Sequence, residues 1–353
     1  MSLTVLSVSY PLAQVSTHTA GGAEQVLAMI DSGLVRAGHR SIVLAPAGSR
    51  CRGLLIPAQV PTGILDEQAK REARREFKKR LDQVLQSYSV DVVHMHGLDF
   101  HEYLPDCDVR VIVNLHLPLG WYARDVLRFV GPNLTLVCVS KSQADTAPTG
   151  AKIDNIIPNG VDLSRFHPAN RRSDYAVVMG RMCPEKGIHL AIDAAERAGI
   201  DLIIAGAVFD YPEHRDYFKT MIQPRLSSSI RFIGPVGGAR KAALLAGARC
   251  LLIPSLAPET SSLVAIEAMA SGTPVIAFPN GALAEIVTHG STGFLVHNAE
   301  EMSDAIASVD SISSCACRRQ AERRFSSEKM LTRYFELYQS VVAAQGAREL
   351  QAA

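Results

Sequence analysis

The 353 residues exceed what one ordinary hydrophobic core organises, so the length predicts two domains of roughly 150 residues each. Hydrophobic residues make up 47% of the chain, charged residues 20%, and the formal net charge is +1. This balance is typical of a globular protein and lacks the strong positive charge of a nucleic-acid-binding protein. No apolar run approaches the roughly 18 residues that span a bilayer, and the start does not resemble a secretory signal. We therefore expect a cytoplasmic protein.

The seven cysteines are scattered and odd in number, which favours reduced thiols over a disulfide framework. Cys51, Cys107, Cys138, Cys183 and Cys250 lie in or beside apolar stretches, and we expect them to be buried. Cys315 and Cys317 are too close together for the usual zinc spacing and have no histidine nearby. The sequence thus predicts no structural metal.

Short apolar runs alternate with longer amphipathic stretches in the first half of the chain. The pattern predicts strands at 3–8, 41–45, 91–94, 110–115 and 134–139, and helices at 24–37 and 68–87. Such β–α alternation is typical of a parallel sheet with helices on both faces. The alternation ends near Ile157–Asp162, so the first domain is predicted to span residues 1–165.

A second alternation predicts a second domain at residues 170–326. Strands are expected at 175–179, 201–205, 230–233, 250–253, 274–277 and 293–296, and helices at 187–198, 215–226, 239–246 and 263–270. A long final helix at about 327–345 follows. The two halves therefore predict an α/β protein with two Rossmann-like domains. Ligands of such sheets bind at the carboxyl ends of the strands, so two facing domains would form a deep cleft.

The segment from Gly180 to Gly187 directly follows one predicted strand and precedes a helix. Its glycines permit close backbone approach, and Arg181 and Lys186 place two cations five residues apart. A loop of this kind at a helix N-terminus suits a polyanion. The alternative is a surface turn with two solvated charges.

Two glutamates eight positions apart mark the segment around the predicted helix at 263–270. Thr260, Ser261 or Ser262 would cap this helix, which leaves Glu259 in the preceding loop and Glu267 on the second turn. Apolar neighbours surround Glu267, so its carboxylate needs a strong partner. The hydroxyls of a ribose would serve, and a salt bridge to a neighbouring helix is the alternative.

Three histidines and a pair of glycines follow strands of the first domain. His94 and His96 share one face of a strand and could bind a metal, but no third ligand is evident. His116 ends the next strand and is the better functional candidate. Gly21–Gly22 could cradle a phosphate, although the segment is not the dinucleotide-binding fingerprint, which argues against an NAD-dependent dehydrogenase.

A basic stretch in the second predicted helix raises the question of membrane contact. Phe77 lies among its cations, so the helix could meet anionic lipid at the inner face of a membrane. A solvated helix face is the alternative, because apolar residues there are few. The cations are Lys70, Arg71, Arg74, Arg75, Lys78, Lys79 and Arg80.

Taken together, these motifs resemble the family 4 retaining glycosyltransferases with the GT-B fold. The resemblance runs from Gly21–Glu24 to Phe294–Val296, and its most specific part is Arg181 and Lys186 followed by the pair Glu259 and Glu267. It implies a hexosyltransferase that uses a UDP- or GDP-sugar, needs no metal ion or other cofactor, and glycosylates a small molecule, a glycan or a lipid-linked acceptor.

The resemblance also implies roles for individual residues. Arg181 and Lys186 would bind the donor diphosphate, Glu267 the ribose, and Glu259 a hydroxyl of the transferred sugar. His116 would lie beside the reacting sugar. The remaining donor-binding candidates are Gly21, Gly22, Gly180, Gly206, Val236, Thr260, Ser261, Ser262 and Leu263. Many relatives carry Phe-Gly where this chain has Ser261–Ser262, so the identity of the donor sugar stays open.

Two other functions fit the same motifs. A nucleotide-sugar epimerase with this fold would use the donor site without a separate acceptor. A nucleotide-sugar-binding protein without catalysis would keep the donor site alone. The products formed from a donor distinguish these alternatives from a glycosyltransferase.

Overall fold

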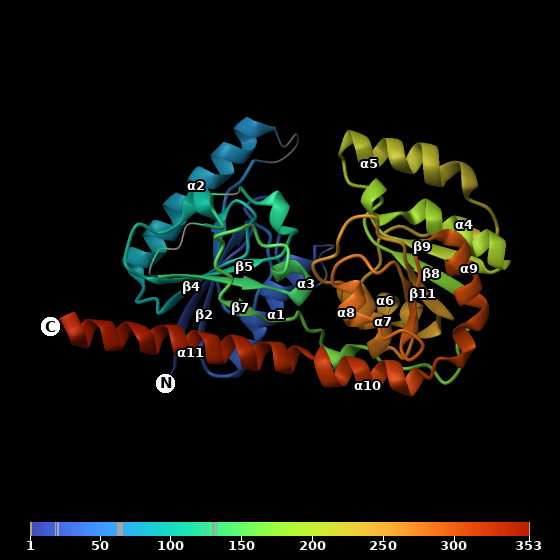
Figure 1. The fold of residues 1–353 in the computed structure, drawn as a ribbon. Helices are drawn as coiled ribbons and strands as arrows, with labels where there is room; N and C mark the ends of the chain where they lie inside the picture. Colours follow the sequence, from blue (N-terminus) through green and yellow to red (C-terminus); the bar gives the residue numbers. More distant parts are fainter. Residues whose placement is uncertain are drawn as a thin grey trace. The chain divides into compact units, whose positions relative to one another are not determined.

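The computed structural model describes residues 2–17, 19, 21–61, 66–123, 125–128, 131 and 133–352. The chain divides into two compact units, here called unit 1 and unit 2 (Figure 1). Unit 1 comprises Met1–Pro158 and Met330–Ala353, and unit 2 comprises Asn159–Lys329. The division falls within the segment Ile157–Asp162, where the alternation in the sequence breaks.

Unit 1 is built on a parallel sheet of seven strands in the order β3-β2-β1-β4-β5-β6-β7. The strands are β1 (Thr4–Val8), β2 (Arg40–Pro46), β3 (Leu54–Ala58), β4 (Val92–Met95), β5 (Arg110–Leu115), β6 (Leu134–Cys138) and β7 (Asn155–Ile156). The helices are α1 (Gly22–Arg36), α2 (Glu67–Ser87), α3 (Lys141–Ala144) and α11 (Ser327–Ala352). The order reverses direction between β1 and β4, and such a switch point is where ligands of parallel sheets bind.

Unit 2 repeats this architecture with six parallel strands in the order β10-β9-β8-β11-β12-β13. The strands are β8 (Tyr175–Met179), β9 (Asp201–Ala205), β10 (Ile230–Phe232), β11 (Cys250–Ile253), β12 (Val275–Ala277) and β13 (Gly293–Leu295). The helices are α4 (Ile188–Ala198), α5 (Pro212–Tyr217), α6 (Gly238–Gly247), α7 (Leu263–Ala270), α8 (Leu283–Ile286), α9 (Ala299–Ser308) and α10 (Ser314–Arg324). Its switch point lies between β8 and β11.

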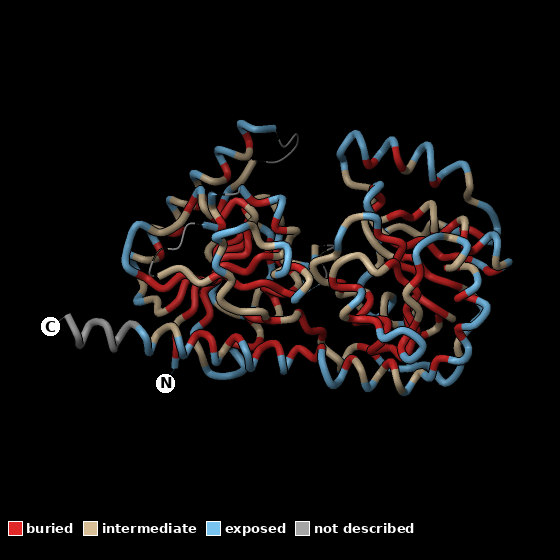
Figure 2. The backbone as a smooth tube through the Cα atoms, viewed as in Figure 1, coloured by how far each residue is buried: buried red, intermediate tan, exposed pale blue. Residues whose placement is uncertain are grey.

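The sheet of unit 2 separates two hydrophobic cores. Along β8, Val177 packs into one core, whereas Ala176 and Val178 pack into the other. Because successive residues of a strand point to opposite faces, a continuous apolar run buries both faces at once. Figure 2 shows the same pattern in both units, with buried strands inside and exposed residues on the helices outside.

The C-terminal helix α11 packs on unit 1 from Met330 onward. Its apolar side recurs at helical spacing, and Tyr334 and Tyr338 are fully buried. The Tyr334 hydroxyl donates to Asn114 Oδ1 (2.9 Å), and the Tyr338 hydroxyl lies 2.8 Å from His94 Nδ1. The helix is thereby tied to the carboxyl ends of β4 and β5.

The helix expected at 215–226 and the expected burial of five cysteines require correction. The helix expected at 215–226 is α5 followed by a π turn and a 3-10 turn, because Pro224 cannot supply the hydrogen bond of a regular helix. Cys107 is exposed and Cys51 only half-buried, whereas Cys138, Cys183 and Cys250 are buried. The short edge strands β3 and β7 were not expected.

Phe77 is fully buried in the core of unit 1, so it is not available to contact a membrane as the sequence suggested. The apolar side of α2 carries Ala73, Phe77, Leu81 and Val84 into that core, which leaves the cations on the outer side. Within the described residues, no helix is long and apolar enough to cross a bilayer.

Gly160 provides a test of close backbone packing in unit 2. A Cβ at this position would lie 2.5 Å from the carbonyl oxygen of Ser326 and 2.8 Å from the amide nitrogen of Ser327. Backbone cannot move as cheaply as a flexible side chain, so we expect Gly160→Ala to lower the free energy of unfolding by about 1–3 kcal/mol. Gly120 is the control, because a Cβ added there would meet no atom within 4 Å beyond its chain neighbours.

Gly120→Ala should change the free energy of unfolding by less than about 0.5 kcal/mol, as is usual for surface substitutions. Urea denaturation of both variants measures the difference. Equal stability of the two variants would show that the Gly160 contact is not close enough to matter.

Candidate functional site

The candidate site in unit 2 lies at the switch point of the sheet. The loop after β8 carries Arg181 and Lys186, and the loop after β11 carries Glu259. Since β8 and β11 are neighbouring parallel strands, both loops leave the same edge of the sheet. The sequence motifs thus converge where a Rossmann-like domain binds its ligand.

Two glycines, Gly187 and Gly206, shape the loop after β8. Gly187 has a φ of +60°, and a Cβ there would lie 2.1 Å from the Pro254 carbonyl oxygen. Gly206, at the end of β9, has a φ of +153°, and its Cβ would lie 1.7 Å from the Gly180 carbonyl oxygen. Gly180 itself meets no such obstacle. The packing therefore requires glycine at 187 and 206, whereas a Cβ at 180 would make only ordinary contacts with Lys186 at 3.8 Å.

Lys186 and Glu259 form an ion pair that joins the two loops. Lys186 Nζ lies 2.5 Å from Glu259 Oε1, and the Ser255 hydroxyl donates to the same oxygen at 2.5 Å. The Glu259 backbone is held by Ala282, whose amide donates to the Glu259 carbonyl at 2.7 Å. Both side chains are partly buried. The pair is therefore positioned from both the side chain and the backbone.

Arg181 lies in the same loop without a carboxylate in ion-pair contact. Its guanidinium carbon lies 6.0 Å from the centre of the Phe209 ring, and it makes no ion pair with any residue that the structure describes. A cation–π contact at this distance contributes at most about 1 kcal/mol and uses none of the guanidinium hydrogen bonds. Arg181 is thus the cation of the loop that remains available to an anion.

The N-terminus of α7 adds hydrogen-bond donors beside Glu259. Ser262 occupies the N-cap position, but its side chain makes no capping hydrogen bond, and the first intrahelical bond runs from Ile266 N to Ser262 O at 3.2 Å. The amides of the first turn, from Leu263 onward, therefore have no capping side chain, and they carry the positive end of the helix dipole. Thr260 and Ser261 lie half-buried in the loop before it.

Glu267 has the partner that the sequence left as an alternative to ribose. Lys241 of α6 places its Nζ 2.5 Å from the Glu267 carboxylate. Burial raises the pKa of Glu267, and the attraction of Lys241 opposes that rise. The salt bridge between neighbouring helices is thus present, and the predicted contact of Glu267 with ribose stays a prediction.

Gly206 and Val236 lie along the strands next to the switch point. The Gly206 amide donates to the Gly234 carbonyl at 2.9 Å, which joins the loops after β9 and β10. Val236 is half-buried in the second of these loops. The two residues therefore share the edge that carries Arg181, on the side of β9.

The three histidines of unit 1 form one cluster, in which His94 and His96 are buried and His116 is half-buried. His96 Nδ1 and Asn114 Nδ2 lie 2.9 Å and 3.1 Å from His116 Nε2. Because the Tyr334 hydroxyl donates to Asn114 Oδ1, the Asn114 amide nitrogen is the donor toward His116. His116 Nε2 is then an acceptor, and its proton resides on Nδ1. His96 likewise carries its proton on Nδ1, which leaves its buried Nε2 without a partner among described residues.

A metal site at His94 and His96, the alternative that the sequence raised, stays a hypothesis. His94 Nδ1 is bonded to the Tyr338 hydroxyl, and His94, His96 and His116 do not bring three ligand atoms within 4.8 Å of one another. Burial lowers the pKa of His94 and of His116 to about 3 and that of His96 well below its usual value. All three side chains are therefore neutral near pH 7.

The N-terminus of α1, where Gly21 and Gly22 were expected to approach a phosphate, is covered by a carboxylate. Glu24 is buried there, and a Cβ on Gly21 would lie 1.8 Å from its Oε2. Burial raises the pKa of Glu24, and a hydrogen bond from its own backbone opposes that rise. An anion at this helix end would have to displace the Glu24 side chain.

Several residues of the site were not predicted from the sequence. Ser255 lies two residues after the end of β11 and could have been found as a polar residue at the carboxyl end of a strand. Lys241 and Phe209 carried no such signal, because their contacts with Glu267 and Arg181 depend on how α6 and the loop after β9 pack.

Family models match both units in order. The glycosyltransferase family 4 model matches residues 20–165, and the model of glycosyl transferases group 1 matches residues 162–327. The chain belongs to the family 4 glycosyltransferases. Among solved structures, the chain is similar to AviGT4, a glycosyltransferase involved in avilamycin A biosynthesis. The two are 28% identical in sequence, and they superpose with a TM-score of 0.73 over 97% of this chain and 98% of AviGT4. The α/β GT-B class predicted from the sequence is confirmed, and the deep cleft between domains stays a prediction.

Two curated relatives carry the name D-inositol 3-phosphate glycosyltransferase. The protein of Mycobacterium avium is 32% identical over 175 residues, which cover 45% of this chain and 41% of that protein. The protein of Pseudarthrobacter chlorophenolicus is 26% identical over 85% of this chain and 84% of its own length. The stronger identity thus spans only about two fifths of the relative's length.

The three clustered histidines predict a loss of stability in acid. Their folded pKa values lie below the value of about 6.5 that an unfolded histidine has, so below about pH 6.5 the unfolded chain binds protons that the folded chain does not. Each histidine then lowers the free energy of unfolding by up to about 1.4 kcal/mol per pH unit as the pH falls from about 6.5 toward about 3.

Urea denaturation between about pH 7 and pH 5 measures this slope. The slope counts the protons that the chain takes up on unfolding. We expect His94→Gln to take up as much as about one proton fewer than the unsubstituted chain, whatever its effect on absolute stability. An identical slope in both proteins would contradict the burial of a neutral imidazole at this position.

Proposed function

We propose that this protein transfers a sugar from a UDP- or GDP-sugar to a hydroxyl acceptor, with retention of configuration and without a metal ion. The observation that carries the proposal is the arrangement at the switch point of unit 2. There, Arg181 without an ion-pair partner among the described residues, the Lys186–Glu259 pair and the uncapped start of α7 gather along one edge of the sheet.

The diphosphate of the donor suits this arrangement by charge. Arg181 and the amides of α7 supply donors that no described side chain uses, and Lys186 can turn from Glu259 toward a phosphate oxygen while keeping its charge paired. Glu259 is then released to accept a hydrogen bond from a sugar hydroxyl.

The same groups supply the chemistry that the family resemblance implies. As the bond between the anomeric carbon and the phosphate oxygen breaks, negative charge develops on the leaving diphosphate. Preorganised cations and amides stabilise that charge, which is the part a divalent metal plays elsewhere. The acceptor oxygen forms the new bond on the same face, and its proton passes to the leaving diphosphate. His116, neutral near pH 7, suits hydrogen bonding to the sugar.

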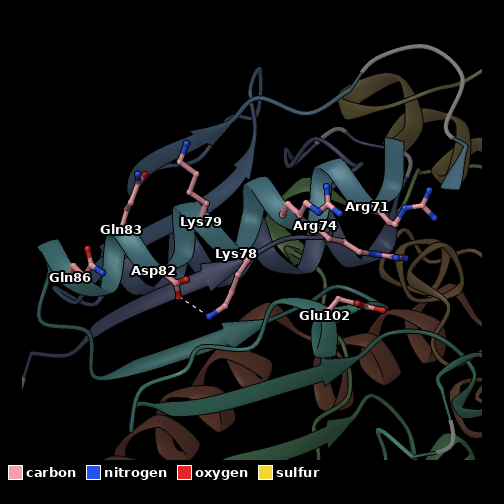
Figure 3. Close-up of a pocket in the computed structure, with 9 residues that line it drawn as sticks. Arg71, Arg74, Lys78, Lys79, Asp82, Gln83, Gln86 and Glu102 are labelled. Carbon is pink, nitrogen blue, oxygen red and sulfur yellow. Dashed lines mark hydrogen bonds and ion pairs between the residues drawn. The ribbon is translucent and has the colours of Figure 1, made fainter. Parts of the chain in front are cut away.

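Basic residues of α2 favour an acceptor that carries phosphate. The outer side of α2 borders a surface pocket of about 700 Å³ that is shown in Figure 3. Arg74 and Lys78 are paired with carboxylates, whereas Arg71, Arg75 and Lys79 make no ion pair with a described residue. The names of the curated relatives, which act on an inositol phosphate, agree with an anionic acceptor. Peripheral membrane contact through these cations stays a prediction.

Removal of Arg181 tests the proposal. Turnover of a panel of UDP-, GDP- and ADP-sugars is measured in chelator, first as slow donor hydrolysis and then with myo-inositol phosphate as acceptor. We expect Arg181→Ala to lower kcat/KM for the active donor by about 10²-fold or more, equivalent to about 3 kcal/mol of transition-state stabilisation. Arg197→Ala removes an exposed arginine of α4 and should leave kcat/KM unchanged.

The products distinguish the alternatives that share this site. A glycosylated acceptor supports the proposal, whereas free epimerised donor would identify an epimerase. Donor binding without any turnover would identify a binding protein. Unchanged turnover in Arg181→Ala would refute the leaving-group role of this residue.

A further inference from the structure

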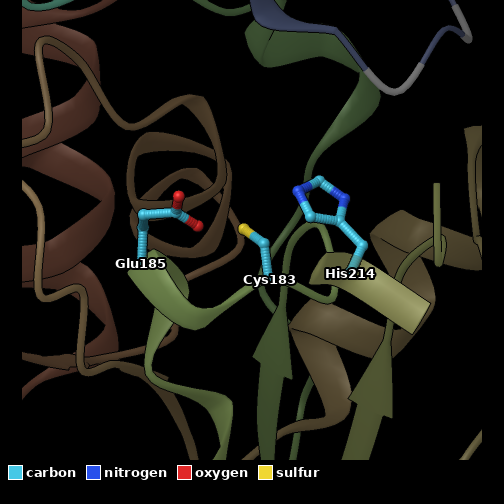
Figure 4. A group of neighbouring side chains, drawn as sticks. All are labelled: Cys183, Glu185 and His214. Atoms are coloured by element: carbon cyan, nitrogen blue, oxygen red, sulfur yellow. The ribbon is translucent and has the colours of Figure 1, made fainter. Parts of the chain in front are cut away.

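A second group of chemically active side chains lies in unit 2 beside the loop after β8. Cys183, Glu185 and His214 place one ligand atom each within 4.8 Å of the others (Figure 4). Cys183 and Glu185 belong to the loop and its 3-10 turn Pro184–Lys186, and His214 belongs to α5. Two segments that are separate in the sequence thus bring together a thiol, a carboxylate and an imidazole.

His214 lacks the hydrogen bonds that a buried imidazole normally makes. The residue is only 8% exposed, and its ring stacks on Phe209 with centroids 6.2 Å apart and meets the Tyr211 ring at 5.1 Å. Its Nδ1 is enclosed without a partner, and neither ring nitrogen bonds to a described residue. Buried polar groups are nearly always satisfied, and a bound ion is one explanation for an exception.

Cys183 and Glu185 are already oriented toward each other. The Cys183 thiol is fully buried, and its sulfur lies within 4.8 Å of a Glu185 carboxylate oxygen. Glu185 is exposed, so the outer side of the group is open to solvent. A cation can therefore reach the thiol from the side of the carboxylate, and the proton of the thiol would leave as the ion binds.

We propose that Cys183, Glu185 and His214 form a binding site for a divalent transition-metal ion of the zinc type. Sulfur, nitrogen and oxygen ligands in one set suit Zn²⁺, and three protein ligands with a fourth open position are a common arrangement for it. A thiolate disfavours Mg²⁺ and Ca²⁺, which prefer oxygen ligands. The Cys183 thiolate and the Glu185 carboxylate balance the charge of the ion. The nearby positive charge of Arg181 therefore does not prevent the ion from binding.

The site ties α5 to the loop that carries Arg181 and Lys186. An ion bound there restrains the backbone between these two cations, because Cys183 and Glu185 lie between them in the sequence. A resulting sensitivity of donor binding to zinc rests on the proposed function. The metal site itself does not, and it can be tested without any donor.

Cobalt titration tests the site directly. Co²⁺ replaces Zn²⁺ in such sites, and a bound thiolate gives a charge-transfer absorption band that water or carboxylate ligands do not. We expect one equivalent of Co²⁺ to produce this band in the full chain and Zn²⁺ to abolish it by displacement. Cys183→Ser should remove the band, and Cys315→Ser, which changes an exposed cysteine, should keep it.

Glu185→Gln is a second test in case Cys183→Ser fails to fold. The Glu185 side chain is exposed, so its replacement should not disturb folding. It should weaken Co²⁺ binding by at least about tenfold, the lower end of the loss seen for groups that merely support metal ligands. Absence of the band in the full chain, its persistence in Cys183→Ser or its loss in Cys315→Ser would overturn the proposal. Donor hydrolysis in chelator tests the proposed function separately, so the two can fail independently.

Discussion

The ion pair between Lys186 and Glu259 connects the two loops on which the site of unit 2 depends. It joins the carboxyl ends of β8 and β11 across the switch point, and Ser255 adds a hydrogen bond to the same carboxylate oxygen. A partly buried pair of this kind costs desolvation, and removal of one partner leaves the other uncompensated. Each charge therefore holds the other in place until a ligand offers a better partner. A diphosphate for Lys186 and a sugar hydroxyl for Glu259 would be such partners.

Charge balance separates the residues of the site into two kinds. Glu267 is buried and Lys241 is partly buried, and the two charges neutralise each other. Arg181 contacts the face of Phe209, and the α7 amides have no capping side chain. The hydrogen-bond donors that remain at the edge of the sheet favour an anion. At α1 of unit 1, by contrast, Glu24 already covers the corresponding helix end.

The fold and the positions of the motifs could be predicted from the sequence because both are local. Apolar runs bounded by turns gave β8, β11 and α7, and the order of strands in a parallel sheet then placed Arg181, Lys186 and Glu259 at one edge. Partners brought by packing could not be predicted. Lys241 reaches Glu267 only because α6 lies against α7, and the burial of Phe77 depends on which side of α2 faces the sheet. Local sequence patterns therefore could not decide whether Glu267 binds ribose or forms a salt bridge.

The most direct test of the account compares two ligands on one variant. Calorimetry in chelator measures the affinity of the active nucleotide sugar and of its nucleoside diphosphate for the full chain and for Glu259→Gln. If Glu259 releases Lys186 to the diphosphate and binds the sugar, the variant should lose affinity for the nucleotide sugar by about tenfold, the loss of about one hydrogen bond to a charged group. Its affinity for the nucleoside diphosphate should stay equal or rise. An equal loss for both ligands would contradict the account.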